Sequence, residues 1–174
     1  MDRLYAPWRM AYIEQPQKDS ASPQSQGRTG SQGRTGCVFC AAAASADDAG
    51  SLIVHRGKAA FVLLNLFPYN NGHLMVVPYL HTAQLSDLDD DASLELWTLA
   101  RRAQAALEKV MHPEGYNLGM NLGTVSGAGI ADHLHLHVVP RWNGDTNFMP
   151  VLADVKVLPD ALENTCRKLR AAWE

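Results

Sequence analysis

Residues 133–141 constrain the fold of this chain more than any other stretch, because histidine alternates with an aliphatic residue along them: His-Leu-His-Leu-His-Val-Val-Pro-Arg. A period of two is typical of a half-buried β-strand, whose successive side chains point to opposite faces of a sheet. The sequence therefore predicts a strand that carries His133, His135 and His137 in a row on one face. The aliphatic residues between them are expected to face a core.

Three histidines in one row indicate chemistry rather than packing alone. Imidazole changes its charge near neutral pH, so it can act as nucleophile, proton carrier or metal ligand. The spacing also permits all three to bind one catalytic metal ion, since His-x-His is a metal-ligand pattern. The residues alone leave two hypotheses open: covalent catalysis by a histidine, and a metal-dependent hydrolase.

Two cysteines, Cys37 and Cys40, indicate a second kind of site. The chain has three cysteines, too few for a disulfide framework, and in a reducing compartment the Cys-x-x-Cys spacing favours metal ligation or redox chemistry. Two thiolates would supply half of a tetrahedral zinc shell, and His81 and His133 are the candidates for the other half. The alternative is a cysteine pair without metal.

The sequence divides into a domain at residues 37–174 and two preceding segments. Residues 1–14 carry several aromatic side chains and few charges, so they are expected to pack on the domain or on a partner subunit. Residues 15–36 contain the hexapeptide Ser-Gln-Gly-Arg-Thr-Gly twice in tandem. Because a run of small polar residues cannot bury a core, we expect a flexible low-complexity loop there.

Apolar runs bounded by turn residues place the strands of this domain. Strands are expected at residues 52–54, 59–65, 74–78, 116–122 and 133–141, and a short helical or loop segment is expected at 41–50. Between the last two strands, residues 123–129 are rich in glycine. Glycine lets the backbone approach a ligand and aim N–H groups at an anion, so Gly127, Ala128 and Gly129 are candidates for phosphate binding.

Two helices are expected. Aspartates within residues 86–91 favour a helix start. Apolar side chains then recur at steps of three and four, which predicts a helix of about five turns. These side chains are Leu96, Leu99, Ala103, Ala106 and Val110. A last helix is expected at residues 160–173, with Cys166 as a small buried side chain in its apolar stripe.

The charge and hydropathy of the chain exclude some partners. A formal net charge of −3 and a pI near 6.1 do not favour a nucleic-acid polymer or an anionic membrane, although a local pocket for a small phosphate ligand is compatible with them. No run reaches the ~20 apolar residues that span a bilayer, and residues 1–5 lack the sections of a signal peptide. We expect a cytoplasmic protein that acts on a small molecule.

The run at residues 133–141, together with Asn65 and Gly-His-Leu-Met-Val-Val-Pro at residues 72–78, resembles the histidine-triad superfamily of nucleotide hydrolases and transferases. Trp-Asn-Gly-Asp-Thr-Asn-Phe at residues 142–148 is similar to its bacterial branch of diadenosine tetraphosphate phosphorylases. The likeness also includes Trp-Arg-Met at residues 8–10. It implies an α+β fold of the histidine-triad type, an antiparallel sheet of about five strands with two main helices, and a homodimer.

The resemblance also implies a role for each histidine. His135 would attack the α-phosphorus of a dinucleoside polyphosphate and carry the nucleoside monophosphate as a covalent intermediate. His137 would hydrogen-bond His135 and fix its tautomer, and His73 would support them from nearby. In members with a Cys-x-x-Cys pair, that pair binds structural zinc together with two histidines at the positions of His81 and His133.

Substrate contacts follow from the same resemblance. Asn65 would hold the ribose hydroxyls, Leu63 would touch the base, and Asn121 would contact the phosphates. Many members have a glutamine where this chain has Gly129, and phosphorylase relatives have Gly-Ser where it has Ala128-Gly129. The acceptor therefore stays open between inorganic phosphate and water. A nucleotide-binding protein with weak catalysis is a third hypothesis.

Overall fold

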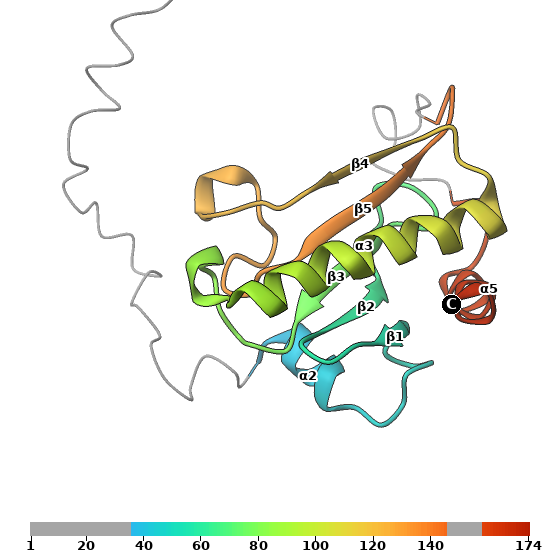
Figure 1. The fold of residues 1–174 in the computed structure, drawn as a ribbon. Helices are drawn as coiled ribbons and strands as arrows, with labels where there is room; N and C mark the ends of the chain where they lie inside the picture. The colour runs from blue at the N-terminus through green and yellow to red at the C-terminus, as the bar shows by residue number, and fades with distance from the viewer. Residues whose placement is uncertain (1–35, 146–157) are drawn as a thin grey trace, which may run out of the picture. The chain divides into compact units, whose positions relative to one another are not determined.

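The computed structural model describes residues 36–145 and 158–174. Within these ranges, five strands form one antiparallel sheet in the spatial order β1-β2-β3-β5-β4 (Figure 1). The strands are β1 (Ile53–Arg56), β2 (Ala60–Leu64), β3 (Leu74–Pro78), β4 (Gly115–Gly119) and β5 (Leu136–Arg141). This sheet confirms the expected α+β fold with about five strands.

Three α-helices lie in the described residues: α2 (Val38–Ala44), α3 (Asp90–Met111) and α5 (Leu162–Ala172). The long helices α3 and α5 are the two main helices that the sequence predicts. Helix α2 is a short third one, and it begins at Val38, ahead of the segment expected at residues 41–50.

The ends of α3 follow from its sequence. The Asp89 carboxylate accepts a hydrogen bond from the Ala92 N–H at 2.7 Å, which satisfies one of the free donors at the helix start. His112 ends the helix in the left-handed conformation, with φ of 47°. Pro113, which cannot continue a helix, comes next.

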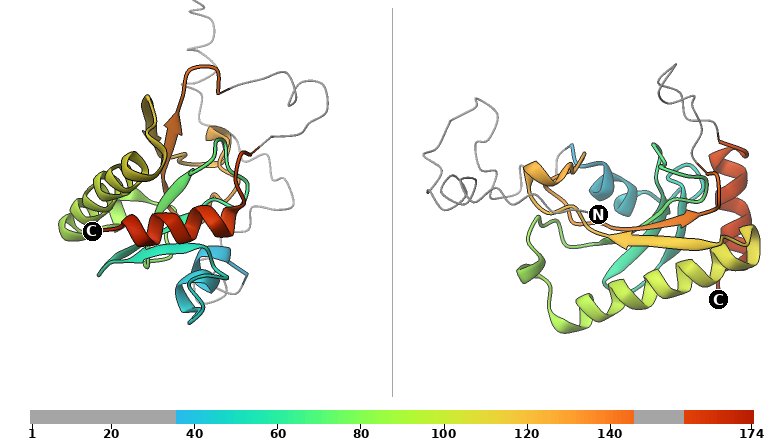
Figure 2. Two further views of the ribbon diagram at one scale, coloured as in Figure 1. Left: turned by 90° about the vertical axis from the view of Figure 1, so that its right-hand side faces the viewer. Right: turned by 90° about the horizontal axis from the view of Figure 1, so that it is seen from above.

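The two faces of the sheet bury different side chains, because neighbours along a strand point in opposite directions. On one face, Val62, Leu74 and Leu136 join a core with α3 and α5. On the other face, Phe61 and Met75 join a smaller cluster with residues of α2. Figure 2 shows α2 and α3 on these opposite faces. The histidine row lies on the α2 face.

Helix α5 packs beside β1 and α3. Its Cys166 is 2% exposed, and the thiol donates to the main-chain oxygen of Ile53 at 3.8 Å. Burial raises the pKa of this thiol above its usual value. The prediction of a small buried cysteine in the apolar stripe is confirmed.

The sequence-based bounds of three strands need correction, and the first of them, β1, covers residues 53–56 rather than 52–54. β5 begins at Leu136 rather than His133, because its ladder with β3 ends at the pair Val76 and Leu136. Before that pair the chain bends at His133, and the N–H of Leu134 donates to Thr82 O at 2.8 Å instead of to β3. β4 covers residues 115–119 rather than 116–122.

Two of the expected segments cannot be compared with the structure. The amino-terminal packing segment at residues 1–14, and all but the last residue of the loop at 15–36, lie outside the described residues. Among the helices in the described ranges, none combines the length and the apolar character needed to cross a membrane.

Candidate active site and metal centre

His135 lies just before β5 and is 5% exposed. Its Nδ1 lies 2.9 Å from the main-chain oxygen of His133. A carbonyl oxygen only accepts hydrogen bonds, so in neutral His135 the proton is on Nδ1 and the lone pair is on Nε2. His135 can therefore act through Nε2 as a nucleophile. The same contact corrects the expectation that His137 fixes this tautomer, because the rings of His135 and His137 meet edge to face, with centres 4.7 Å apart.

His73 and His137 form an ordered chain of hydrogen bonds. The main-chain N–H of Tyr69 donates to Nδ1 of His73 at 3.1 Å, so the proton of neutral His73 is on Nε2. Nε2 of His73 then donates to Nδ1 of His137 over 2.9 Å, which leaves the proton of His137 on its own Nε2. That Nε2 is buried and has no partner among the described residues. This buried N–H without a partner is a candidate donor to an oxygen atom of a ligand.

Both rings of this chain are neutral at pH 7. His73 is fully buried, and burial, followed by the charges of His137 and His135, lowers its pKa from 6.5 to about 3. Burial, followed by the charge of His135, lowers the pKa of His137 from 6.5 to about 4. Because neither ring is protonated at pH 7, each has one N–H and one lone pair, as the hydrogen-bond directions require.

The loop between β2 and β3 positions His73. The main-chain N–H of Asn65 donates to the oxygen of His73 at 2.9 Å and closes the loop. The Asn65 side chain accepts from the N–H of Phe67 at 2.9 Å, and its amide nitrogen lies 3.4 Å from Nδ1 of His73. Gly72 has φ of 79°, and a Cβ there would lie 2.7 Å from the sulfur of Met111. Glycine is therefore required directly before His73.

A cavity of about 870 Å³ opens beside His135, between α2 and the loop after β2. The sequence-predicted residues that line it are Leu63, Asn65, Asn121, Gly127, Gly129, His135 and His137. Ala128, the remaining candidate for phosphate binding, is half-buried and does not line this cavity. The residues expected to contact base, ribose and phosphates are thus brought together, Ala128 excepted.

A second cavity, of about 390 Å³, shares Tyr69, Asn121 and His137 with the first. Asn117 and Arg141 line its outer part. His137 therefore stands between two spaces, the larger of which also reaches His135. A ligand with two separate groups joined by a chain could extend from one space into the other.

Cys37, Cys40, His81 and His133 form the one group of at least three cysteine, histidine or acidic side chains in the described residues that could hold a metal ion. One ligand atom from each lies within 4.8 Å of the others. The four come from the start of α2, the segment after β3 and the segment before β5. This group excludes His135 and His137, so the hypothesis that all three triad histidines bind one metal ion is not supported.

Two of the sulfur–nitrogen distances in this cluster agree with those of a tetrahedral metal site. Around a tetrahedral zinc ion, neighbouring sulfur and nitrogen ligands lie about 3.3–3.8 Å apart, given bonds of about 2.3 and 2.1 Å. The sulfur of Cys40 lies 3.4 Å from Nδ1 of His81 and 3.7 Å from Nδ1 of His133. Nε2 of His133 donates to Pro78 O at 2.8 Å, so the lone pair of His133 is on the Nδ1 that faces the cysteines.

Sequence reasoning missed two aromatic residues at the site. Phe39 is 1% exposed, and its ring centre lies 5.4 Å from that of His133 and 5.1 Å from that of His135. The ring of Tyr69 lies 4.8 Å from His73 and 5.8 Å from His137. Phe39 stands inside the Cys-x-x-Cys motif and Tyr69 stands shortly before His73, so proximity to the motif residues was the available signal.

The row of alternating histidines leads into β5, which lies fourth in the spatial order of the sheet. His135 of this row lines a cavity of about 870 Å³, a volume typical of small-molecule sites. Together these features define a histidine-triad protein. The chain belongs to the histidine-triad (HIT) family, since residues 47–144 match the HIT domain. The matched region contains His73, the triad and the predicted ligands of the nucleotide. It begins after Cys37 and Cys40.

One named relative matches nearly the whole chain. The AP-4-A phosphorylase of Mycobacterium tuberculosis is 42% identical over 178 aligned positions, which cover 99% of this chain and 85% of that protein. The asymmetrical bis(5'-nucleosyl)-tetraphosphatase of Schizosaccharomyces pombe is 32% identical over 96 positions, or 55% of this chain and 52% of the relative.

Solved structures have the same fold. A zinc-bound histidine-triad family protein from Mycobacterium smegmatis superposes with a TM-score of 0.63 at 30% identity, over 80% of this chain and 94% of its own. The fold and the family expected from the sequence are therefore confirmed.

Proposed function

We propose that this protein transfers a nucleoside monophosphate from a dinucleoside polyphosphate to an acceptor, through a covalent bond to His135. The observation that carries the proposal is the fixed tautomer of His135, with its lone pair on Nε2, in a residue that lines a cavity of about 870 Å³. The similarity to an AP-4-A phosphorylase over 99% of the chain supports diadenosine tetraphosphate as substrate and inorganic phosphate as acceptor.

In the first step, Nε2 of His135 forms a bond to the α-phosphorus while the bond from that phosphorus to the bridging oxygen breaks. With a dinucleoside tetraphosphate, a nucleoside triphosphate leaves with the bonding electron pair. The His135 ring becomes cationic, and the oxygen of His133, 2.9 Å from Nδ1, stabilises that charge. The N–H on Nε2 of His137 donates to a phosphate oxygen, where negative charge increases.

In the second step, an oxygen of inorganic phosphate bonds to the same phosphorus and the phosphorus–nitrogen bond breaks. The electron pair returns to Nε2 of His135, a nucleoside diphosphate is released, and the proton of the attacking oxygen passes to solvent. With water as acceptor, the product is a nucleoside monophosphate. The tautomer of His135 is the same at the start and at the end of the cycle, because Nδ1 keeps its proton throughout.

The cavity residues supply the substrate contacts in this proposal. Leu63 packs on the base and Asn65 holds the ribose hydroxyls, and both line the cavity with His135. Asn121 contacts the phosphates together with the N–H groups of residues 127–129. His73 holds the tautomer of His137 and does not touch the substrate. We further propose that residues 37–174 form the catalytic domain and that the protein is a cytoplasmic homodimer. Light scattering after size-exclusion chromatography tests the dimer.

We further propose that Cys37, Cys40, His81 and His133 bind one structural zinc ion. The donor set, its spacing and the zinc-bound relative from Mycobacterium smegmatis support this assignment. Zinc would neutralise the thiolates and connect the start of α2 to the chain segments next to β3 and β5. His135 lies outside the cluster, so no step of the reaction requires the metal.

Two other functions remain as alternatives. The similarity to a tetraphosphatase from Schizosaccharomyces pombe favours hydrolysis, with water as acceptor, as the second candidate. A binding protein with weak catalysis would hold adenosine nucleotides in the same cavity without useful turnover. Product analysis separates all three.

The test is to incubate the protein with diadenosine tetraphosphate, with and without inorganic phosphate, and to identify the products by anion-exchange chromatography. ADP and ATP that form only with phosphate support phosphorolysis. AMP that forms without phosphate supports hydrolysis, and very slow turnover with tight AMP binding supports a binding protein.

Matched variants test the nucleophile. His135→Ala should abolish turnover and leave the fold and the zinc content intact. His112→Ala, which removes an exposed histidine at the end of α3, should keep full activity. An active His135→Ala protein would refute the covalent mechanism.

A further inference from the structure

Helix α2 is too short to be stable through its own hydrogen bonds. It has seven residues, Val-Phe-Cys-Ala-Ala-Ala-Ala, with no side-chain cap at its start and no basic residue in its last turn. Isolated helices shorter than about 12–15 residues are marginal in water. Contacts from other elements must therefore hold α2 in place. Cys37 and Cys40 contact His133 and His81 at the start of the helix, so a second contact must hold its end.

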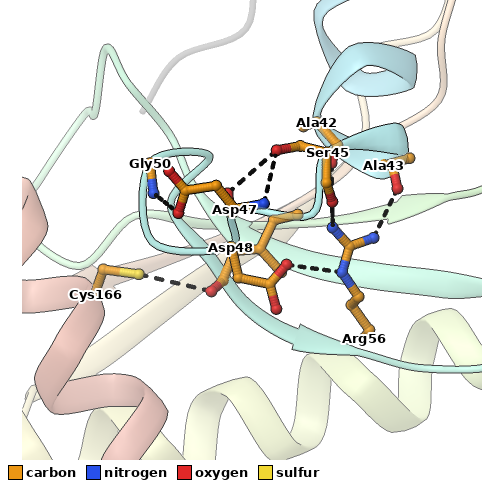
Figure 3. Close-up of polar contacts among 9 residues, drawn as sticks. Ala42, Ala43, Ser45, Asp47, Asp48, Gly50, Arg56 and Cys166 are labelled. Atoms are coloured by element: carbon orange, nitrogen blue, oxygen red, sulfur yellow. Dashed lines mark hydrogen bonds and ion pairs between the residues drawn. The ribbon is translucent and has the colours of Figure 1, made fainter.

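Arg56, at the end of β1, binds the carboxyl end of α2 (Figure 3). Its guanidinium donates to the main-chain oxygens of Ala43 and Ser45, each at 2.8 Å, and of Ala42 at 3.2 Å. The last carbonyl groups of a helix have no partner within the helix and carry partial negative charge. The planar guanidinium of arginine can donate to several of these carbonyl oxygens at once, whereas the compact ammonium group of lysine cannot reach them in the same geometry.

The rest of the contacts make Arg56 a rigid support. Its Nε donates to the Asp48 carboxylate at 2.9 Å, and the main-chain N–H of Ile53, on the same strand, donates to Asp48 O at 2.8 Å. The Arg56 side chain is 29% exposed, so solvent screens these interactions less than on an open surface. β1 pairs with β2, which places Arg56 opposite Phe61.

Helix α2 is also a wall of the nucleotide cavity. Phe39 and Ala42 of α2 line the cavity that Leu63, Asn65 and His135 line from the sheet side. Phe39 is 1% exposed and packs against the ring of His135. A shift of α2 would therefore widen the cavity and remove a neighbour of the nucleophile.

We propose that Arg56 is a positioning residue, which fixes the end of α2 and with it the wall of the cavity that receives the nucleoside. The proposal rests on the proposed function, since it assigns that cavity to the nucleotide. Arg56 acts through α2 and does not touch the substrate. The tautomer of His135 depends on the His133 oxygen rather than on α2, so loss of Arg56 should affect binding more than chemistry.

The test compares Arg56→Ala, Arg56→Lys and the matched control Lys58→Ala. Lys58 carries an exposed cation on the same hairpin, and its side chain makes no hydrogen bond or ion pair within the described residues. Three quantities are measured for each: kcat and KM with diadenosine tetraphosphate, the Kd of AMP by calorimetry, and hydrogen exchange at the amides of α2. Zinc content and the unfolding temperature show whether each variant is folded.

Arg56→Ala is expected to raise KM and the AMP Kd on the order of tenfold, as loss of one charged hydrogen bond would, with kcat changed less than about threefold. Arg56→Lys should give most of the same change, because an ammonium keeps the charge but not the fork of donors. Exchange at the α2 amides should rise in both. Methylguanidinium added to Arg56→Ala should restore AMP affinity, and Lys58→Ala should match the wild type.

A folded Arg56 variant with faster exchange in α2 and wild-type KM and AMP Kd would overturn the proposal, because α2 would then be loosened without effect on the site. A fall in kcat at unchanged KM would overturn it as well. If Arg56→Ala does not fold, Arg56→Lys decides by the same criteria. Failure of the proposed function is a separate result: the wild type itself would neither turn over the dinucleotide nor bind AMP.

Discussion

The buried His73 predicts a specific loss of stability in acid. The pKa of His73 falls from 6.5 in the unfolded chain to about 3 in the folded protein. Between these pH values the unfolded state binds a proton that the folded state does not. The free energy of unfolding therefore decreases as the pH falls from 6.5 toward 3, and His73 causes no loss above pH 6.5. At pH 5, one and a half units below the unfolded pKa, the loss from His73 is about 2 kcal/mol at 1.36 kcal/mol per unit.

Urea unfolding at pH 7 and pH 5, followed by circular dichroism in saturating zinc, measures this loss. With an m value of about 2 kcal/mol per molar urea, 2 kcal/mol corresponds to about 1 M in the midpoint. His73→Gln removes the titrating group and keeps a donor and an acceptor, so the difference between the two pH values should shrink by that amount. His112→Gln, at an exposed histidine, is the control. The same pH difference in His73→Gln and wild type would refute the reasoning.

Three further substitutions test single features of the fold and the metal cluster. Asp89→Ala removes the cap of α3 and should lower the free energy of unfolding by about 1 kcal/mol in urea titration. His112→Gly relieves a left-handed residue with φ of 47° and should raise the free energy of unfolding by about 0.5–1 kcal/mol. Cys40→Ser should abolish zinc binding in elemental analysis and lower the unfolding temperature by about 5 °C or more. A zinc-replete Cys40→Ser protein, or no change of stability at either helix end, would contradict these assignments.

Much of the sheet could be predicted because its signals are local. The run at residues 74–78 is apolar throughout and forms β3 at the expected bounds. The helix after Asp89 could be predicted because a cap and a periodic apolar face coincide. The start of β5 could not be predicted, because the alternation continues through His133 and Leu134, while the N–H of Leu134 donates to the main-chain oxygen of Thr82, beyond the end of β3.

The members of the site were easier to predict than their contacts. Cys37, Cys40, His81 and His133 are residue types that bind metal at a familiar spacing, and the structure brings them within 4.8 Å. Arg56 carries no such signal, since an arginine before a glycine turn is ordinary in any hairpin. Besides the Asp48 carboxylate, its partners are main-chain oxygens at the end of α2, 11–14 residues before it, and main-chain acceptors cannot be read from side-chain types.

The same limit explains why the three histidines of the row have different hydrogen-bond partners. His133 donates from Nε2 to the oxygen of Pro78, so its Nδ1 lone pair is available to a metal ion. His135 donates from Nδ1 to the oxygen of His133, so its lone pair is on Nε2, as the proposed nucleophile requires. His137 accepts on Nδ1 from His73, so it offers an N–H on Nε2. Imidazole alone therefore does not decide between ligand, nucleophile and donor. The acceptor or donor that the fold places next to each ring decides which nitrogen carries the proton, and so which of these roles the ring can take.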